Sequence, residues 1–227
     1  MAILALGEHA IEDSGRSVAT VFRGNLLRAE PKDVVEGSTP VVAWSGWLAE
    51  DADESKGAFP RDFRTWTKPA WAEFDGAIDR LVSELMRAGT ELWLRPHSRH
   101  FLADPQTCVS FLLRRVGQPI RVFLDPASML TASMLGRADD HLDRALAALA
   151  DHPGVAAVLL ANVERLEGSG DEDALVAAPL HRGLIEPGLV AAAWRRHGRG
   201  TTPAVLIGRE MARQVEVLGV TGSEAVG

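Results

Sequence analysis

Short apolar segments alternate with amphipathic helical segments along most of this 227-residue chain, and this alternation constrains the fold most. Six apolar runs have the composition and length of β-strands, and they lie at residues 17–22, 39–47, 92–94, 120–124, 155–161 and 203–207. Apolar residues at helical spacing predict helices at residues 71–88, 106–116, 138–150, 187–197 and 210–218. No Asn-Gly type hairpin signal joins two of the runs, so the alternation predicts an α/β fold with a parallel sheet.

The strand count and the length predict one domain over residues 1–227, a TIM-type (β/α) barrel of parallel strands. Residues 2–6 are apolar too, and they predict either a seventh strand or the first turn of a helix. A closed (β/α)8 barrel occupies about 250 residues. The chain is therefore expected to lack one or two N-terminal βα units. Such a gap leaves two unpaired strand edges, which suggests a homodimer formed through them.

A long polar segment over residues 50–69 interrupts the alternation. It contains Phe59, Phe63 and Trp66, and aromatic residues are scarce in segments that cannot pack. Two interpretations stay open, a loop folded over the barrel mouth and a surface flap packed on a helix. At the other end of the chain, the tail 219–227 is expected to be frayed.

Composition excludes several classes of partner. The net charge of -7 and the pI near 5.5 argue against a broad nucleic-acid or anionic-membrane surface. Cys108 is the only cysteine, so no disulfide forms within the chain. The first residues carry no basic signal-peptide region, and no apolar run reaches about 18 residues. We therefore expect a cytoplasmic protein that is not membrane-bound.

Polar side chains follow the predicted strands, where α/β barrels place their chemistry. No glycine-rich dinucleotide or P-loop motif, hydrolase elbow or HExxH motif is present. The candidates for ligand binding are Arg23, Arg95, Asn162 and Arg209. A single arginine at a strand end is usually a solvated cap, but several at one rim predict an anion-binding mouth.

Two further residues at this rim are candidates for catalysis. His97 is the one plausible acid/base, although a solvated loop position is the alternative. Asp125 begins Asp-Pro-Ala-Ser directly after an apolar run, where a carboxylate could accept a sugar hydroxyl or bind a metal. A turn-capping aspartate is nearly as good an interpretation.

The order of LWLRPHSRH, RVFLDPASMLT, VAAVLLANVERL, APLHRGLIE and PAVLIGRE resembles the xylose isomerase-like sugar phosphate isomerase/epimerase TIM barrels, from about residue 17 to residue 218. The resemblance implies the barrel fold, a sugar or sugar phosphate ligand and a divalent metal such as Mn, Mg or Zn. It also implies carboxylates that move protons between adjacent sugar carbons.

The residues implied as metal ligands are largely replaced in this sequence. Only Asp125 matches, while Arg95 stands at the position of the first glutamate, Leu159 at the histidine, Asn162 at the following aspartate and Ile207 at the late ligand. A hard divalent ion needs several oxygen or imidazole ligands. The sequence therefore predicts no metal and no other cofactor.

These observations predict a divergent sugar isomerase/epimerase-like protein that binds a small anionic sugar-type ligand at the barrel mouth. One alternative is a non-catalytic paralogue that senses a ligand or scaffolds an active enzyme. A second alternative is a conventional metal-dependent isomerase in which Glu91, Glu164 or Glu210 supplies ligands out of register.

Overall fold

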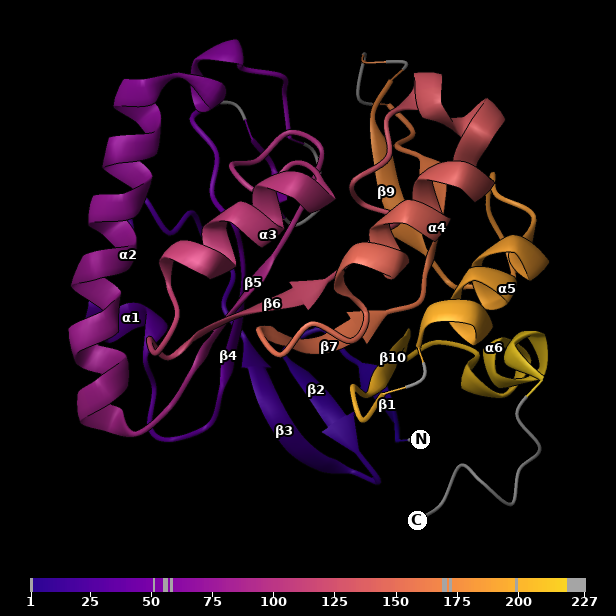
Figure 1. Ribbon diagram of the computed structural model, residues 1–227, viewed down its shortest axis with the longest axis horizontal. Coiled ribbons are helices and arrows are strands. Elements are labelled where there is room, and N and C mark those ends of the chain that lie inside the picture. Colours follow the sequence, from indigo (N-terminus) through magenta and orange to yellow (C-terminus); the bar gives the residue numbers. More distant parts are fainter. Residues whose placement is uncertain are drawn as a thin grey trace.

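Eight strands close into a barrel in the order β1-β10-β7-β6-β5-β4-β3-β2 (Figure 1). The computed structural model describes residues 2–50, 52–54, 57, 59–168, 171, 173–198 and 200–219. The barrel strands are β1 (Ile3–Leu6), β2 (Ala10–Asp13), β3 (Arg16–Val21), β4 (Val41–Trp44), β5 (Leu92–Arg95), β6 (Ile120–Leu124), β7 (Val155–Leu159) and β10 (Ala204–Ile207). All neighbouring pairs except those of β2 are parallel. The predicted TIM-type barrel is confirmed.

The five helices that the apolar period predicts all form, as α2 to α6, and the short α1 is an addition. They are α1 (Pro31–Val34), α2 (Lys68–Ala88), α3 (Pro105–Arg114), α4 (Ala138–Leu149), α5 (Pro187–His197) and α6 (Met211–Leu218), with 3₁₀ turns η2 (Phe63–Trp66) and η3 (Ala132–Arg137). Helix α2 buries Phe74, Ile78, Leu81 and Leu85 on one face. Asp104 caps α3 by accepting a hydrogen bond from the Thr107 N–H at 2.8 Å. None of the described helices is long and apolar enough to cross a membrane.

The N-terminal closure of the barrel differs from the prediction. Strand β2 runs antiparallel between β1 and β3, so the expected gap is filled and the sheet is mixed. The turn at Ser14 and Gly15 has φ of 48° and 81°, the pair of positive values that a tight hairpin needs. Figure 1 shows these three strands together at the lower edge, away from α2, α3 and α4. The barrel edges no longer provide a reason for dimerisation.

A second hairpin, β8 (Asn162–Arg165) with β9 (Leu175–Ala178), was also missed. The run 155–161 predicted one strand, but β7 ends at Leu159 and the chain turns within two residues into β8. The predicted loop 168–173 joins the two strands of this hairpin, and the tail 220–227 lies outside the described residues.

Residues 50–67, between β4 and α2, are here called the lid, and its described part lies over the barrel mouth. Phe59 is buried against Trp47 and Ala49 in a small cluster separate from the main core. Val176 of β9 lies close to the lid, 3.1 Å from the position of a Cβ on Gly57. Its described residues Glu54, Gly57 and Phe59 line the cavity at this mouth, which favours the first interpretation of the polar segment.

Candidate functional site

The carboxyl ends of the parallel strands surround a cavity of about 210 Å³. Barrel, lid and β9 all contribute to its wall, which includes Leu6, Arg23, Trp44, Glu54, Phe59, Arg95, His97 and Val176. A neighbouring hollow of about 630 Å³ shares Arg23 and Arg95 and extends to the exposed Arg209. The structure therefore brings the three predicted arginines to one mouth, although Arg95 ends β5 and the other two follow β3 and β10.

Arg95 is held in the cavity wall by Asp125. Its Nε and Nη2 donate hydrogen bonds of 2.9 and 2.7 Å to Asp125 Oδ2, and its guanidinium lies 4.0 Å over the ring of Trp44. Ser128 donates two further hydrogen bonds to the Asp125 carboxylate, from its Oγ to Oδ2 at 2.6 Å and from its N–H to Oδ1 at 3.1 Å. Nη1 of Arg95 makes no hydrogen bond within the described residues.

This geometry changes the role expected for Asp125. Its side chain is fully buried, and four donated hydrogen bonds occupy its two oxygens. A carboxylate in this state has little capacity left for a sugar hydroxyl or a metal ion. Asp125 is the counterion that orients Arg95, so its predicted direct contact with a ligand does not fit the structure.

Arg23 and Arg209 are more open than Arg95. Arg23 donates to the Glu8 carbonyl at 3.0 and 3.3 Å and approaches the Glu8 carboxylate at 3.5 Å, with both side chains well exposed. Arg209 makes no side-chain hydrogen bond or ion pair within the described part of the chain. Exposed ion pairs are weak, so both cations can turn toward an incoming anion at little cost.

Glu54 is the titratable residue that the sequence did not single out. The lid places it in the cavity wall beside Arg23 and Arg95, and the backbone N–H of Gly24 donates a hydrogen bond to it. Burial raises the pKa of Glu54 from 4.5 to about 7, although the two arginines and this hydrogen bond act in the opposite direction. The residue is thus divided between its acid and carboxylate forms near neutral pH. Only the polar character of the lid pointed toward it.

His97 lies in the cavity wall as a neutral imidazole. Its Nδ1 accepts a hydrogen bond from the Arg99 N–H at 3.1 Å, which leaves the ring proton on Nε2. Burial, together with the positive charges of Arg99 and Arg95, lowers the pKa of His97 from 6.5 to about 3. Such a ring is a poor base at neutral pH, so the acid/base role predicted for His97 does not fit this state. It can donate one hydrogen bond into the cavity.

His100 lies behind His97 in an aromatic cluster. Its ring is 4.3 Å from that of Phe59, 5.1 Å from Trp47 and 4.7 Å from His97, measured between centroids. Neither ring nitrogen has a hydrogen-bond partner within the described residues. Burial, followed by the neighbouring His97 and Arg95, lowers the pKa of His100 well below 6.5. The lid therefore rests on two uncharged histidines.

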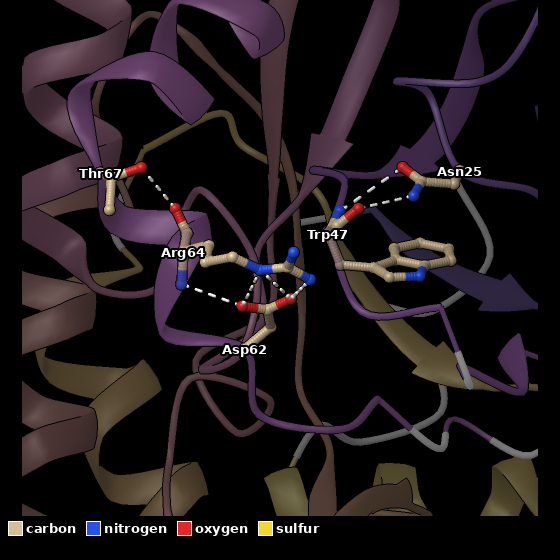
Figure 2. A network of polar contacts seen from close by, with 5 residues as sticks. All are labelled: Asn25, Trp47, Asp62, Arg64 and Thr67. Atoms are coloured by element: carbon tan, nitrogen blue, oxygen red, sulfur yellow. Dashed lines mark hydrogen bonds and ion pairs between the residues drawn. The ribbon is translucent and has the colours of Figure 1, made fainter.

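Polar contacts fix both ends of the lid, as Figure 2 shows. Asn25 donates to the Trp47 carbonyl at 2.6 Å where the chain leaves β4. At the other end, Asp62 caps η2 by accepting from the Arg64 N–H at 2.9 Å, and Thr67 Oγ1 donates to the Arg64 carbonyl at 2.8 Å. The first contact joins the loop after β3 to the chain after β4, and the other two order η2 locally.

Arg99 holds the centre of the lid. The buried Arg99 donates from Nη1 to the Phe59 carbonyl and to Asp171 Oδ2, both at 2.7 Å. Asp171 belongs to the connection between β8 and β9, so one guanidinium joins the lid, the β5–α3 loop and the second hairpin. The hydrogen bond from Arg99 is the main reason that the pKa of Asp171 lies below 3.8.

Asn162 does not lie at the mouth as a ligand-binding residue. It is fully buried, with its Nδ2 donating to the Ile185 carbonyl at 2.7 Å and its Oδ1 accepting from the N–H groups of Val163 and Ile185. Gly183 passes so close that a Cβ there would lie 2.4 Å from Oδ1. Asn162 therefore ties β8 to the following loop, and its predicted ligand contact is wrong.

The residues at the mouth do not fit a divalent cation. Arg95 occupies the carboxylate of Asp125, and the described residues contain no group of three or more His, Cys, Asp and Glu side chains that could hold a metal ion. Glu91 precedes β5 at the opposite end of that strand, Glu164 is exposed on β8, and Glu210 pairs with other side chains near α6. The out-of-register ligand set therefore does not assemble.

Fold and site together define an α/β barrel with a lidded, arginine-lined cavity at the carboxyl ends of its strands. No protein-family model matches the chain, and no curated protein matches it. Solved structures do resemble it, and they include proteins of the kind that the sequence order resembles.

Among them is a probable 3-DHS dehydratase from Bacillus anthracis, with 11% identity, a TM-score of 0.47 and coverage of 78% of this chain and 61% of that chain. A xylose isomerase domain protein from Planctomyces limnophilus shows 13% identity and a TM-score of 0.43, with coverage of 79% and 56%. A magnesium complex of a xylose isomerase-like TIM barrel protein from Mycobacterium smegmatis shows 14% identity and a TM-score of 0.43, with coverage of 81% and 61%. The matched region thus spans about three-fifths of these chains.

Proposed function

We propose that this protein binds a small anionic sugar-type ligand in the lidded cavity, as a divergent sugar isomerase/epimerase-like protein. The observation that carries the proposal is that Arg23, after β3, and Arg95, at the end of β5, line one cavity. Guanidinium groups bind carboxylate and phosphate oxygens through charge-assisted hydrogen bonds. Arg209, at the adjoining hollow, supplies a third cation near the entrance.

The remaining wall is suited to the neutral part of such a ligand. Glu54 can accept or donate a hydrogen bond with a hydroxyl, and His97 can donate from Nε2. Trp44 and Phe59 add apolar surface beside these groups. A few convergent polar groups on an otherwise apolar wall are typical of small-molecule sites.

Calorimetric titration with D-gluconate, a sugar acid, tests the proposal, with the uncharged polyol D-sorbitol as the ligand control. We expect binding of gluconate but not of sorbitol. Because a hydrogen bond to a charged group contributes about 1.5–3 kcal/mol, Arg95→Gln in the compensated background Asp125→Asn should weaken gluconate binding about 10- to 100-fold. The matched control is Arg87→Gln, an exposed arginine of α2 outside the cavity. Equal affinity in the cavity variant and the control would contradict the proposal.

The second candidate is a ligand-sensing or scaffolding protein without turnover. It is favoured by the low pKa of His97, since the expected acid/base residue is uncharged and already hydrogen-bonded. Both candidates use the same anion-binding cavity and differ in whether the bound sugar reacts. Nuclear magnetic resonance of D-fructose 6-phosphate in deuterated water separates them. Turnover of either kind produces the signals of a new sugar phosphate, and turnover through an enediol also introduces deuterium at a carbon next to the carbonyl.

A further inference from the structure

We propose that Glu54 takes up a proton when the anionic group of the ligand binds beside Arg23 and Arg95, so that ligand and proton enter the cavity together. This inference rests on the proposed function, and it names the lid residue that makes binding depend on pH. If so, the lid covers the cavity and also contributes a side chain that exchanges a proton during binding.

The first step of the argument is the position of Glu54. The charged residues that line the cavity with it are Arg23 after β3, Arg95 at the end of β5 and Glu8 after β1, while His97 is uncharged. In the ligand-free protein Glu54 is therefore the inner carboxylate that faces the two arginines. Glu8 is much more exposed and pairs with Arg23 from the outside.

The second step is competition for the same cations. A carboxylate or phosphate bound between Arg23 and Arg95 would share about 210 Å³ with the Glu54 carboxylate. Two anions at such close range repel, and the usual resolution is that one of them holds a proton. Glu54 is the group that can do so, because burial has already raised its pKa to about 7. Protonated Glu54 gains an O–H donor that can bond to the ligand.

The expected effect is a measurable proton uptake. A group with a pKa of about 7 is half protonated at pH 7 and about one-tenth protonated at pH 8. Binding should therefore take up about half a proton at pH 7 and nearly one at pH 8, and affinity should fall about tenfold between pH 8 and pH 9.

Calorimetry with D-gluconate, in Tris and imidazole buffers of different ionisation enthalpy, measures this uptake directly. Gluconate itself does not titrate near pH 7–9. Glu54→Gln keeps the shape and a hydrogen-bond donor but removes the titration. We expect this variant to bind gluconate without proton uptake and about tenfold more tightly than the wild type at pH 8.

Glu8→Gln is the matched control, since it removes the other carboxylate of the mouth. It should leave the proton uptake of the wild type unchanged. Uptake that persists in Glu54→Gln, or gluconate binding by the wild type without uptake, would overturn this inference alone. Failure of the wild type to bind gluconate would overturn the proposed function and this inference with it.

Discussion

Replacing Arg95 by methionine should destabilise the protein strongly, because it leaves the Asp125 carboxylate buried with only Ser128 as a donor. The Asp125 side chain is fully buried, and Arg95 is 15% exposed along the cavity. Removing one partner of a buried ion pair costs about 3–5 kcal/mol, and the contact of Arg95 with the cavity favours the lower end, about 3 kcal/mol. For a domain of this size that loss lowers Tm by about 6–12 °C.

Thermal and urea unfolding, followed by tryptophan fluorescence, measure this loss. The double variant Arg95→Met with Asp125→Leu removes both charges and should return to within about 2 kcal/mol of the wild type. The control Arg23→Met breaks an exposed pair with Glu8 and should cost less than about 1 kcal/mol. Single variants whose losses simply add in the double variant would refute the pairing argument.

Three further predictions concern acid, the lid and metal. Because burial lowers the pKa of His97 and His100, unfolding takes up protons, so stability should fall as pH drops from 6.5 toward 3. Parallel pH–Tm curves for the wild type and His100→Phe would contradict this. Arg99→Gln should speed hydrogen exchange in the lid, where the bond to the Phe59 carbonyl is lost, without changing α2. Elemental analysis of the purified protein should find no stoichiometric Mn, Mg or Zn, and a full equivalent would contradict the ligand count.

Much of the barrel could be predicted because its elements carry strong local signals. The apolar stripe of α2 and the Asp104-Pro105 start of α3 fix those helices, and the structure agrees within a few residues. Strand β2 was missed because only Ile11 of its four residues is buried, and its Ser14-Gly15 turn is a weaker hairpin signal than Asn-Gly. Strand β8 was hidden because it follows β7 almost without interruption.

The site was predictable in position but not in detail. Arg23 and Arg95 were expected to meet because parallel strands end on one side of the barrel, and they do face one cavity. A sequence cannot show whether a polar side chain at a strand end turns to the cavity or to the backbone, so Asn162 was misassigned. Glu54 was missed because its position depends on how the lid packs, through contacts of Phe59 that are distant in sequence.

The most direct test of the anion-binding mouth is a crystal structure with selenate, whose anomalous scattering locates the anion without prior assumptions. The arrangement of the arginines predicts a selenium peak within hydrogen-bonding reach of both Arg23 and Arg95, under the lid. The same peak should be lost in the Arg95→Gln, Asp125→Asn variant. An empty cavity in crystals that bind selenate elsewhere would contradict the central claim.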